Sequence, residues 1–264
     1  MHFAELDSDK WKQYAERSAP PMKWIYARER RTLLEFEARV ARSFSENVFC
    51  TPLEQKIFRE RIPGASSIVL RNGVDTAFYE PRPEQAEARH LIFTGVMDYL
   101  PNIDGCEFFA RLVLPLLRPR YSDLRFTIVG SNPSAAVRAL AQLPGVTVTG
   151  FVDDTRAWLS KASISVAPLR IARGIQNKVL EALAMGLPVV GTTSATQGID
   201  GVDGRDFIVA NSAQQQAAAI SRLFDAPDEA RALGERGRDF VVRQYDWEQV
   251  FEPLDRLLER LSPT

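Results

Sequence analysis

The chain has 264 residues, of which 45% are hydrophobic and 25% are charged, a composition that suits a globular protein with a sizeable core. With 33 basic and 34 acidic residues the net charge is -1, so no chain-wide basic field is available to hold a nucleic-acid backbone. No apolar run approaches the roughly 20 residues of a membrane span. Residues 1–7 lack the basic region and apolar stretch of a secretion signal, so we expect a cytoplasmic protein.

The two cysteines, Cys50 and Cys106, each lie in an apolar stretch. We expect them to be free, buried thiols rather than a disulfide. Together with the two histidines, His2 and His90, they show no zinc-ligand spacing. The sequence therefore predicts no metal site.

The first part of the chain has few periodic segments. Residues 1–20 are polar, and an arginine-rich helical pattern follows over 24–44. We interpret its arginines as a solvated face, with a membrane-surface role as the less favoured alternative. A strand is predicted at 47–50, a helix with Thr51 as N-cap, and a second strand at 67–70. Residues 79–90, with two prolines and many charges, read as an exposed linker.

After this linker, short apolar strands alternate with helices, a pattern that predicts an α/β protein with a doubly wound parallel sheet. Glycines 95, 130 and 150 follow three of the strands, and such sheets bind ligands at the carboxyl ends of their strands. The predicted strands are 90–94, 124–129, 146–149, 163–167, 188–190 and 207–210. The predicted helices are 104–117, 135–143, 154–161, 177–185, 212–224, 228–243 and 247–261.

The stretch 166–190 carries the clearest chemistry. It predicts a strand, a loop facing a helix N-terminus, that helix, and a second strand, and a helix N-terminus attracts anions. Arg170, Arg173 and Lys178 add positive charge there. Glu181 lies three residues after Lys178, so both side chains can face one ligand. A carboxylate beside an anion site has a use if it accepts hydrogen bonds from sugar hydroxyls; a solvated helix carboxylate is the alternative.

Residues 180–190, Leu-Glu-Ala-Leu-Ala-Met-Gly-Leu-Pro-Val-Val, closely match the Leu-Glu-Ala-(Met/Leu)-Ala-x-Gly-x-Pro-Val-Val pattern of another group of proteins. The chain thus resembles the retaining GT-B glycosyltransferases called group 1. The resemblance implies that Glu181 binds the ribose hydroxyls of a nucleotide donor. Arg173 falls where the family has its first Glu, which is a departure that leaves the donor sugar open. The variant Arg-Gly-Ile-Gln-Asn-Lys over 173–178 is similar to a bacterial subgroup associated with exopolysaccharide synthesis, in which Lys178 suits leaving-group stabilisation.

Further segments resemble the family, namely 70–75, 126–130, 146–152 and 245–247. The turn at 95–102 departs from it because the family's Arg and Lys are absent there. Since the resemblance begins midway through the family's first domain, it implies that the N-terminal half-domain is missing. Residues 1–78 would be a helix-rich remnant of the acceptor domain, and 79–264 the Rossmann-like donor-binding domain with C-terminal helices.

The resemblance implies retaining sugar transfer from a nucleoside-diphosphate sugar, with no cofactor, to a glycan or lipid-linked acceptor. The enzyme would work in the cytoplasm, with a peripheral contact to the inner face of the membrane left open. Expected catalytic residues are Arg173 and Lys178. Expected donor-binding residues are Gly95, Gly130, Arg170, Gly174, Asn177 and Glu181.

The sequence leaves two other functions to compare with this one. One is a nucleotide-sugar-binding partner subunit without independent catalysis, whose missing half-domain comes from a second chain. The other, an NAD-dependent oxidoreductase, is disfavoured because no Gly-x-Gly-x-x-Gly follows a strand; Gly234 and Gly237 lie inside a helical pattern.

Overall fold

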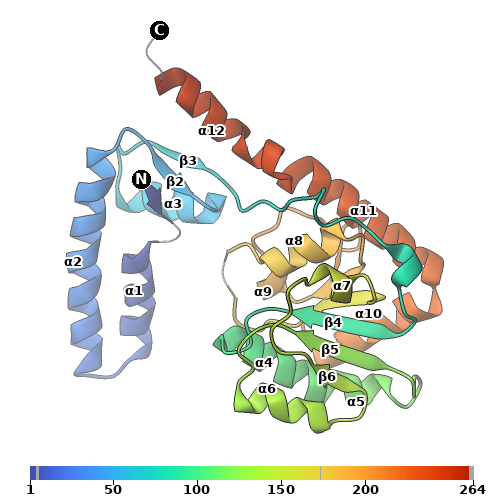
Figure 1. Ribbon diagram of the computed structural model, residues 1–264. Helices are drawn as coiled ribbons and strands as arrows, with labels where there is room; N and C mark the ends of the chain where they lie inside the picture. The colour runs from blue at the N-terminus through green and yellow to red at the C-terminus, as the bar shows by residue number, and fades with distance from the viewer. Residues whose placement is uncertain (4–5, 173, 262–264) are drawn as a thin grey trace. The chain divides into compact units, whose positions relative to one another are not determined.

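The computed structural model describes residues 1–3, 6–172 and 174–261. They form two compact units (Figure 1). The first unit comprises Met1–Asn72 and the C-terminal segment from Val250, and the second comprises Gly73–Gln249. The boundaries differ from the predicted ones in two places: residues 73–78, assigned from sequence to the first part, belong to the second unit, and the segment from Val250, assigned to the second part, belongs to the first unit. The acceptor and donor roles assigned to the two parts stay predictions.

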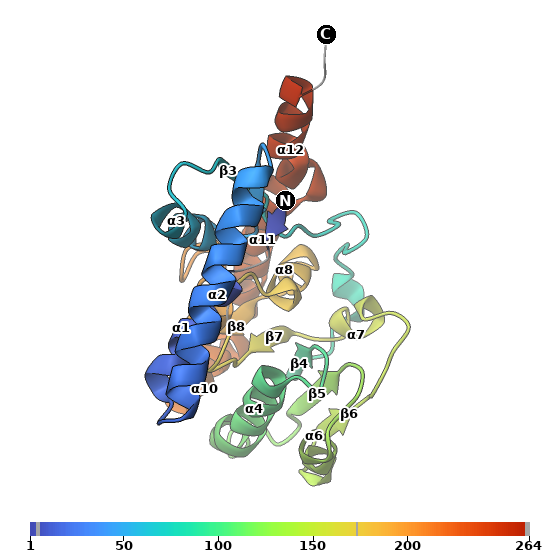
Figure 2. The ribbon, with the colours of Figure 1, turned by 90° about the vertical axis from the view of Figure 1, so that its left-hand side faces the viewer.

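The first unit contains a three-stranded parallel sheet of order β1-β2-β3. Helices α1 and α2 lie side by side as a hairpin (Figures 1 and 2). The elements are β1 (His2–Phe3), α1 (Asp7–Arg17), α2 (Met22–Ser43), β2 (Asn47–Phe49), α3 (Pro52–Arg61), β3 (Ser67–Val69) and, for the most part, α12 (Trp247–Leu261). The sequence did not predict β1 and α1, because a two-residue strand has no periodicity and the polar α1 is held by tertiary contacts of Trp11 and Tyr14 with Tyr26 on α2.

Three aromatic rings form the centre of this unit. Phe49 lies 5.5 Å from Phe3 and 4.6 Å from Phe58, measured between ring centroids. The predicted cap of α3 is confirmed, since the Thr51 hydroxyl accepts the Glu54 N–H at 3.1 Å. Residues close together in the chain therefore determine where α3 begins, whereas the three-stranded sheet forms only when distant segments pair.

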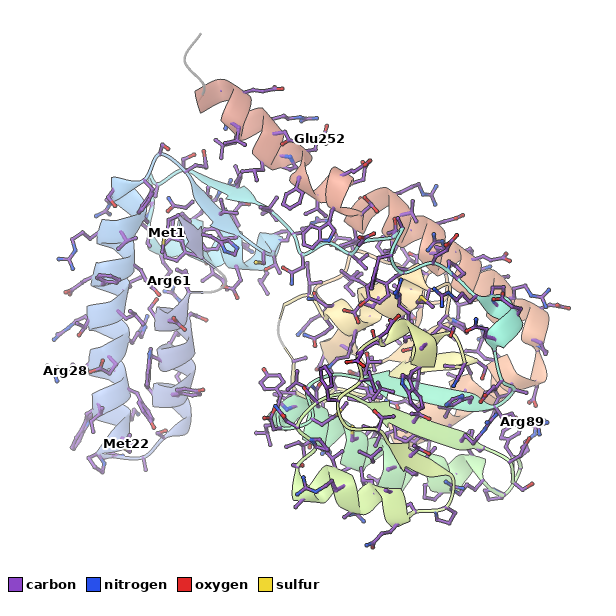
Figure 3. The ribbon with its side chains drawn as sticks, in the orientation of Figure 1. Met1, Met22, Arg28, Arg61, Arg89 and Glu252 are labelled. Carbon is purple, nitrogen blue, oxygen red and sulfur yellow. The ribbon has the colours of Figure 1, made fainter. Side chains whose placement is uncertain are left out.

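The arginines of α2 lie mainly in solvent. Arg28, Arg31 and Arg39 are exposed, and Figure 3 shows Met22 at the end of α2 nearest the α1–α2 turn. Apolar side chains are also exposed on this helix, with Trp24 68% accessible. The arginine face is therefore exposed, which both the solvated-face interpretation and the membrane-surface alternative require.

The second unit is built on a six-stranded parallel sheet of order β6-β5-β4-β7-β8-β9, which confirms the predicted fold class. Its elements are η1 (Pro83–Gln85), β4 (His90–Thr94), α4 (Leu100–Phe108), η2 (Phe109–Val113), α5 (Leu114–Leu117), β5 (Arg125–Val129), α6 (Ala135–Ala139), η3 (Leu140–Gln142), β6 (Val146–Val148), α7 (Arg156–Leu159), β7 (Ile164–Ala167), α8 (Asn177–Ala184), β8 (Val189–Gly191), α9 (Thr193–Thr196), β9 (Ile208–Val209), α10 (Ala213–Asp225) and α11 (Pro227–Tyr245).

The strand order determines where a ligand can bind. From β4 the chain adds strands outward through β5 to β6, then returns to the other side of β4 with β7 and continues to β9. In such sheets the crevice lies beyond the carboxyl ends of the strands where the order reverses, here β4 and β7. Figures 1 and 2 show α4 and α8 on opposite faces of the sheet.

Two elements differ from the predictions. The helix expected from residue 104 begins at Leu100, with Pro101 in its first turn, and it contains the π-helical stretch η2. Helix α9 was not predicted, because four residues carry no periodicity. Its cap, the Thr192 hydroxyl, accepts the Ala195 N–H at 3.2 Å.

Both cysteines are free, as expected; Cys106 is buried and Cys50 half-buried. Burial raises the pKa of the Cys106 thiol to about 12. Among the described residues, no group of three or more His, Cys, Asp or Glu side chains is placed to hold a metal ion. None of the described helices combines the length and apolar composition that crossing a membrane requires.

Candidate functional site

The turns after β4 and β5 are packed backbone against backbone. A Cβ on Gly130 would stand 1.6 Å from the Gly95 carbonyl oxygen, so no residue larger than glycine fits at position 130 in this conformation. Main-chain hydrogen bonds join neighbouring strand ends: the Gly95 N–H donates to the Val129 carbonyl at 3.0 Å, and the Gly130 N–H donates to the carbonyl of Gly150, which follows β6, at 3.2 Å. The carboxyl ends of β4, β5 and β6 therefore form one connected surface of main chain.

Helix α8 brings Lys178 to this surface. The Lys178 ammonium donates to Oδ1 of Asn102 at 2.5 Å and lies 4.8 Å from the centre of the Phe93 ring. It would be 3.3 Å from a Cβ on Gly95. The turn after β4 lacks the family's cations in sequence, yet a cation from α8 reaches it in space.

The environment of Lys178 lowers its pKa to about 8, mainly by desolvation, while the neighbouring Glu181 carboxylate acts in the opposite direction. An ammonium poorly hydrated in the free protein has much to gain from an anionic ligand. This makes Lys178 a suitable group to stabilise a diphosphate.

Glu181 lies one turn further along α8 and accepts a hydrogen bond from the Tyr79 hydroxyl. Desolvation raises the pKa of Glu181, and the charge of Lys178 and the Tyr79 hydrogen bond lower it. Tyr79 also interacts with Thr155 through its hydroxyl, and desolvation raises its own pKa. The carboxylate is thus oriented by Tyr79, which belongs to the segment interpreted from sequence as an exposed linker.

Arg170, on the loop between β7 and α8, is held differently. Its guanidinium makes a two-pronged ion pair with the Asp104 carboxylate, with Nε donating at 2.9 Å, and stacks 5.1 Å from the Phe108 ring. The pair raises the pKa of Arg170. Half of the side chain remains exposed, so a ligand can still reach it, but Asp104 neutralises much of its charge.

The unpredicted helix α9 and its flanks support the same loop. The Thr192 hydroxyl donates to the Leu169 carbonyl, and the Gln197 amide donates to the Ala172 carbonyl at 2.8 Å. A Cβ on Gly198 would stand 2.5 Å from the carbonyl oxygen of Gly174, whose φ is +64°. Because only glycine leaves this space, Gly198 is a supporting position that the sequence analysis missed.

The structure therefore brings Gly95, Gly130, Lys178 and Glu181 together at the carboxyl edge of the sheet. Asn177 is exposed at the start of α8. Arg173 lies outside the described residues.

Three further contributors were not predicted: Tyr79, Asn102 and Phe93. Asn102 did leave a signal in the sequence. It is a polar residue among Leu, Pro and Ile at the start of an apolar helix, and only 4% of its surface is exposed.

A desolvated cation and a carboxylate near a helix N-terminus can bind a ligand that carries both phosphate and hydroxyl groups. The fold is a doubly wound α/β sheet whose ligand edge lies at β4 and β7.

A sequence profile described as "Glycosyl transferases group 1" matches residues 88–226, slightly more than half of the chain. The chain belongs to this family. The fold agrees: sucrose-phosphate synthase (tll1590) from Thermosynechococcus elongatus superposes with a TM-score of 0.75 at 19% identity, over 98% of this chain and 67% of that one. The architecture is that of the GT-B glycosyltransferases.

Two other proteins are informative. The GDP-mannose-dependent alpha-(1-6)-phosphatidylinositol monomannoside mannosyltransferase of Mycobacterium tuberculosis is 30% identical over 216 residues, which are 71% of this chain and 54% of that protein. Anabaena Alr3699/HepE, solved with UDP and glucose, has a TM-score of 0.70 at 15% identity, over 87% of this chain and 67% of that one. The chain spans about half the length of the curated relatives it matches.

Proposed function

We propose that the second unit binds a nucleoside-diphosphate sugar and that the protein transfers the sugar, with retention, to a lipid-linked or glycan acceptor. One observation carries the proposal: Lys178 and Glu181 lie together at the carboxyl edge of the sheet, close enough to perturb each other's pKa. Glu181 accepts hydrogen bonds from the ribose hydroxyls, and Lys178 contacts the diphosphate. The family membership and the fold support this assignment.

In the reaction, the departing nucleoside diphosphate gains negative charge, and preorganised cations and amides stabilise it. Lys178 is preorganised by Asn102 and Phe93. The first-turn amides of α8 and the Gly174 amide are the accompanying donors. Arg173 has the same role by resemblance alone, and Arg170 contributes less because Asp104 neutralises it.

GDP-mannose is the first donor to test, because the M. tuberculosis relative is GDP-mannose-dependent; UDP-glucose is the second, because HepE binds UDP and glucose. The acceptor class proposed is a lipid-linked glycan, since that relative acts on a phosphatidylinositol mannoside. Exopolysaccharide assembly is the alternative that the variant motif at 173–178 favours.

Work on a lipid-linked acceptor needs access to a membrane surface. The exposed Trp24, Ile25 and Arg28 of α2 suit a peripheral contact, because aromatic and basic side chains favour the interface. Cosedimentation with anionic vesicles, compared between wild type and the Trp24→Ser/Ile25→Ser variant, tests this contact. If wild type and the double variant bind the vesicles equally, then these residues of α2 do not form the membrane contact.

The main test is a thermal-shift and calorimetric screen with GDP, UDP, TDP, ADP and NAD. We expect one nucleoside diphosphate to bind and Glu181→Ala to weaken it at least tenfold, because charge-assisted hydrogen bonds contribute about 1.5–3 kcal/mol each and 1.4 kcal/mol is tenfold. The matched control is Glu248→Ala, an exposed carboxylate at the start of α12. Unchanged affinity in Glu181→Ala would rule out the ribose assignment.

A second candidate is a nucleotide-sugar-binding partner subunit that completes its site with another chain. Sugar transfer assayed with the 264-residue chain alone separates the two candidates. Nucleotide binding without turnover supports the partner subunit, and efficient turnover excludes it.

A further inference from the structure

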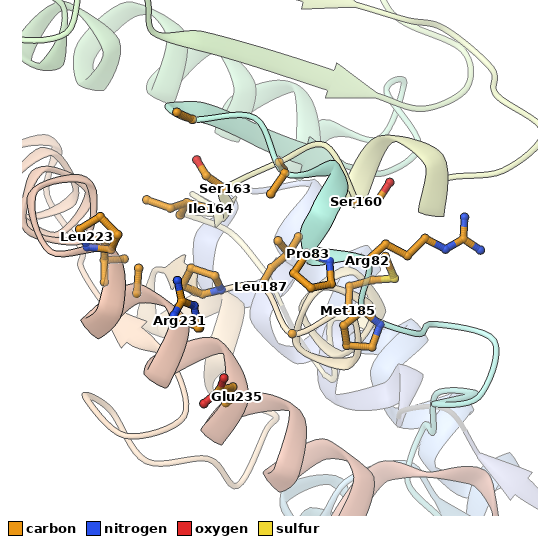
Figure 4. A pocket seen from close by; sticks show the side chains of 18 of the residues that line it. Arg82, Pro83, Ser160, Ser163, Ile164, Met185, Leu187, Leu223, Arg231 and Glu235 are labelled. Carbon is orange, nitrogen blue, oxygen red and sulfur yellow. The ribbon is translucent and has the colours of Figure 1, made fainter.

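The second unit contains a cavity of about 690 Å³ at the edge of the sheet opposite the nucleotide site (Figure 4). Arg89, which directly precedes β4, lines it, as do Ser163 before β7 and Pro188 before β8. The cavity thus lies at the amino ends of these strands. Five residues of β4, about 16 Å of extended chain, separate it from the turn at Gly95.

The cavity has the size and lining of a small-molecule site, since such sites measure about 300–1,000 Å³ and are mostly apolar. Leu187, Leu223 and Phe224 form part of its wall, and Ala230 stands on the α11 side. The segment of the second unit that precedes β4 covers another side of the cavity, with Pro81, Pro83 and Ala86 among its lining residues. An apolar body of a few rings or one hydrocarbon chain fits this space.

Charge at the cavity is unbalanced. Four arginines stand among its described lining residues, against one carboxylate, Glu235. They are Arg82, Arg89, Arg231 and Arg238. Figure 4 shows Arg231 beside Leu187 and Leu223, with Arg82 extending from the other side.

Three of these arginines have partners in the structure, and not all of these partners neutralise the positive charge. Arg89 is paired with Asp123 at 2.8 Å, so it is neutralised. Arg238 donates to main-chain carbonyls, including that of Tyr79 at 2.9 Å, which carry no formal charge. Arg231 is 3.5 Å from Asp228 in an exposed pair, and such pairs are worth little in water. The attraction between Arg231 and a bound anion therefore outweighs the loss of the weak ion pair with Asp228.

We propose that this cavity binds a small amphipathic anion: an apolar body inside, with a carboxylate or phosphate at Arg231. Burial of the apolar body supplies the affinity, and the arginine selects the charge. The cavity shares no lining residue with the nucleotide site, so the proposal stands independently of the sugar-transfer function.

The probe for the test is cis-parinaric acid, a fluorescent fatty carboxylate, titrated into the full chain below its micelle concentration. We expect saturable binding to one site and at least tenfold weaker binding of its methyl ester. Ala230→Trp and Ala88→Trp, which fill the cavity from two different segments, should each weaken binding at least tenfold. Arg231→Glu should weaken it at least fivefold, and Arg243→Glu, on the same helix but outside the cavity, should not.

Circular dichroism and thermal melting show whether each variant folds. If one of the two filling variants does not fold, the other still tests the cavity. Equal affinity for acid and ester would overturn the charge selection. Wild-type affinity in the folded filling variants would overturn the site. A third outcome would also overturn the proposal. If the wild-type chain does not bind the probe but forms a dimer in sedimentation, and if the filling variants abolish that dimer, then the cavity is a contact between two copies of the chain.

Discussion

The Lys178 ammonium is joined to the turn after β4 by one residue, Asn102, whose Oδ1 accepts from it at 2.5 Å. The same amide group donates through Nδ2 to the Val96 carbonyl at 2.8 Å. Because its nitrogen is committed to Val96, the amide can present only its oxygen to the ammonium. Asn102 thereby fixes the position of the cation on which the proposed diphosphate contact depends.

Asn102→Ala should weaken nucleoside-diphosphate binding about three- to tenfold, because the ammonium loses the charge-assisted hydrogen bond that fixes its position. Asn102→Asp should weaken it more, since the new carboxylate opposes the diphosphate. Calorimetry measures both. The control is a double-mutant cycle with Lys178→Met, in which the effect of Asn102→Ala should disappear. Additive effects would show that Asn102 does not act through Lys178.

Lys178 should leave a signature in the pH dependence of stability. Its pKa is lowered to about 8 in the folded protein, against about 10.4 unfolded. Between these values the unfolded state binds more protons, so the free energy of unfolding gains from rising pH. Relative to Lys178→Met, wild type should become more stable between pH 8 and 10.5 and stay level below pH 7. Urea unfolding at a series of pH values tests this; a flat difference would contradict the lowered pKa.

Tyr79→Phe should shift the pH profile of nucleotide binding. The Tyr79 hydroxyl donates to the Glu181 carboxylate and lowers its pKa, against the raising effect of desolvation. Without that hydrogen bond the pKa of Glu181 rises further, and the carboxylate that accepts the ribose hydroxyls is lost at a higher pH. Calorimetry between pH 4.5 and 7.5 should show the midpoint of affinity loss moving upward. Tyr121→Phe, which removes a hydroxyl bonded to Asp225, is the matched control and should leave it in place.

Gly130→Ala should destabilise the second unit by more than about 3 kcal/mol, because overpacking against rigid main chain is costly and the new Cβ would meet the Gly95 carbonyl. Gly150→Ala provides the comparison. A Cβ there meets nothing within 4 Å, but φ is +73°, so the loss should be about 1–2 kcal/mol. Urea unfolding ranks the two. Equal losses would mean that the turns after β4 and β5 can separate at little cost.

The sequence by itself predicted most of the strands and the longer helices, and it placed two charged groups of the candidate site on one helix. Continuous apolar strands between helices specify a parallel sheet, because buried strands need apolar side chains on both faces. The cap of α3 by Thr51 could be predicted, because the capping hydroxyl and the N–H that it accepts lie only three residues apart in the chain. The spacing of Lys178 and Glu181 on one helix placed a cation beside a carboxylate. Each of these inferences needs only neighbours along the chain.

Only the tertiary structure decided which groups serve that pair. Asn102 meets Lys178 across 76 residues, and Tyr79 reaches Glu181 from a segment that looks like a linker. The Arg170 charge, counted from sequence as available, is paired with Asp104. The amino-edge cavity has no sequence signature either. These relationships depend on strand order and register, which bring distant segments to one edge of the sheet; periodicity along the chain carries no information about which segments meet there.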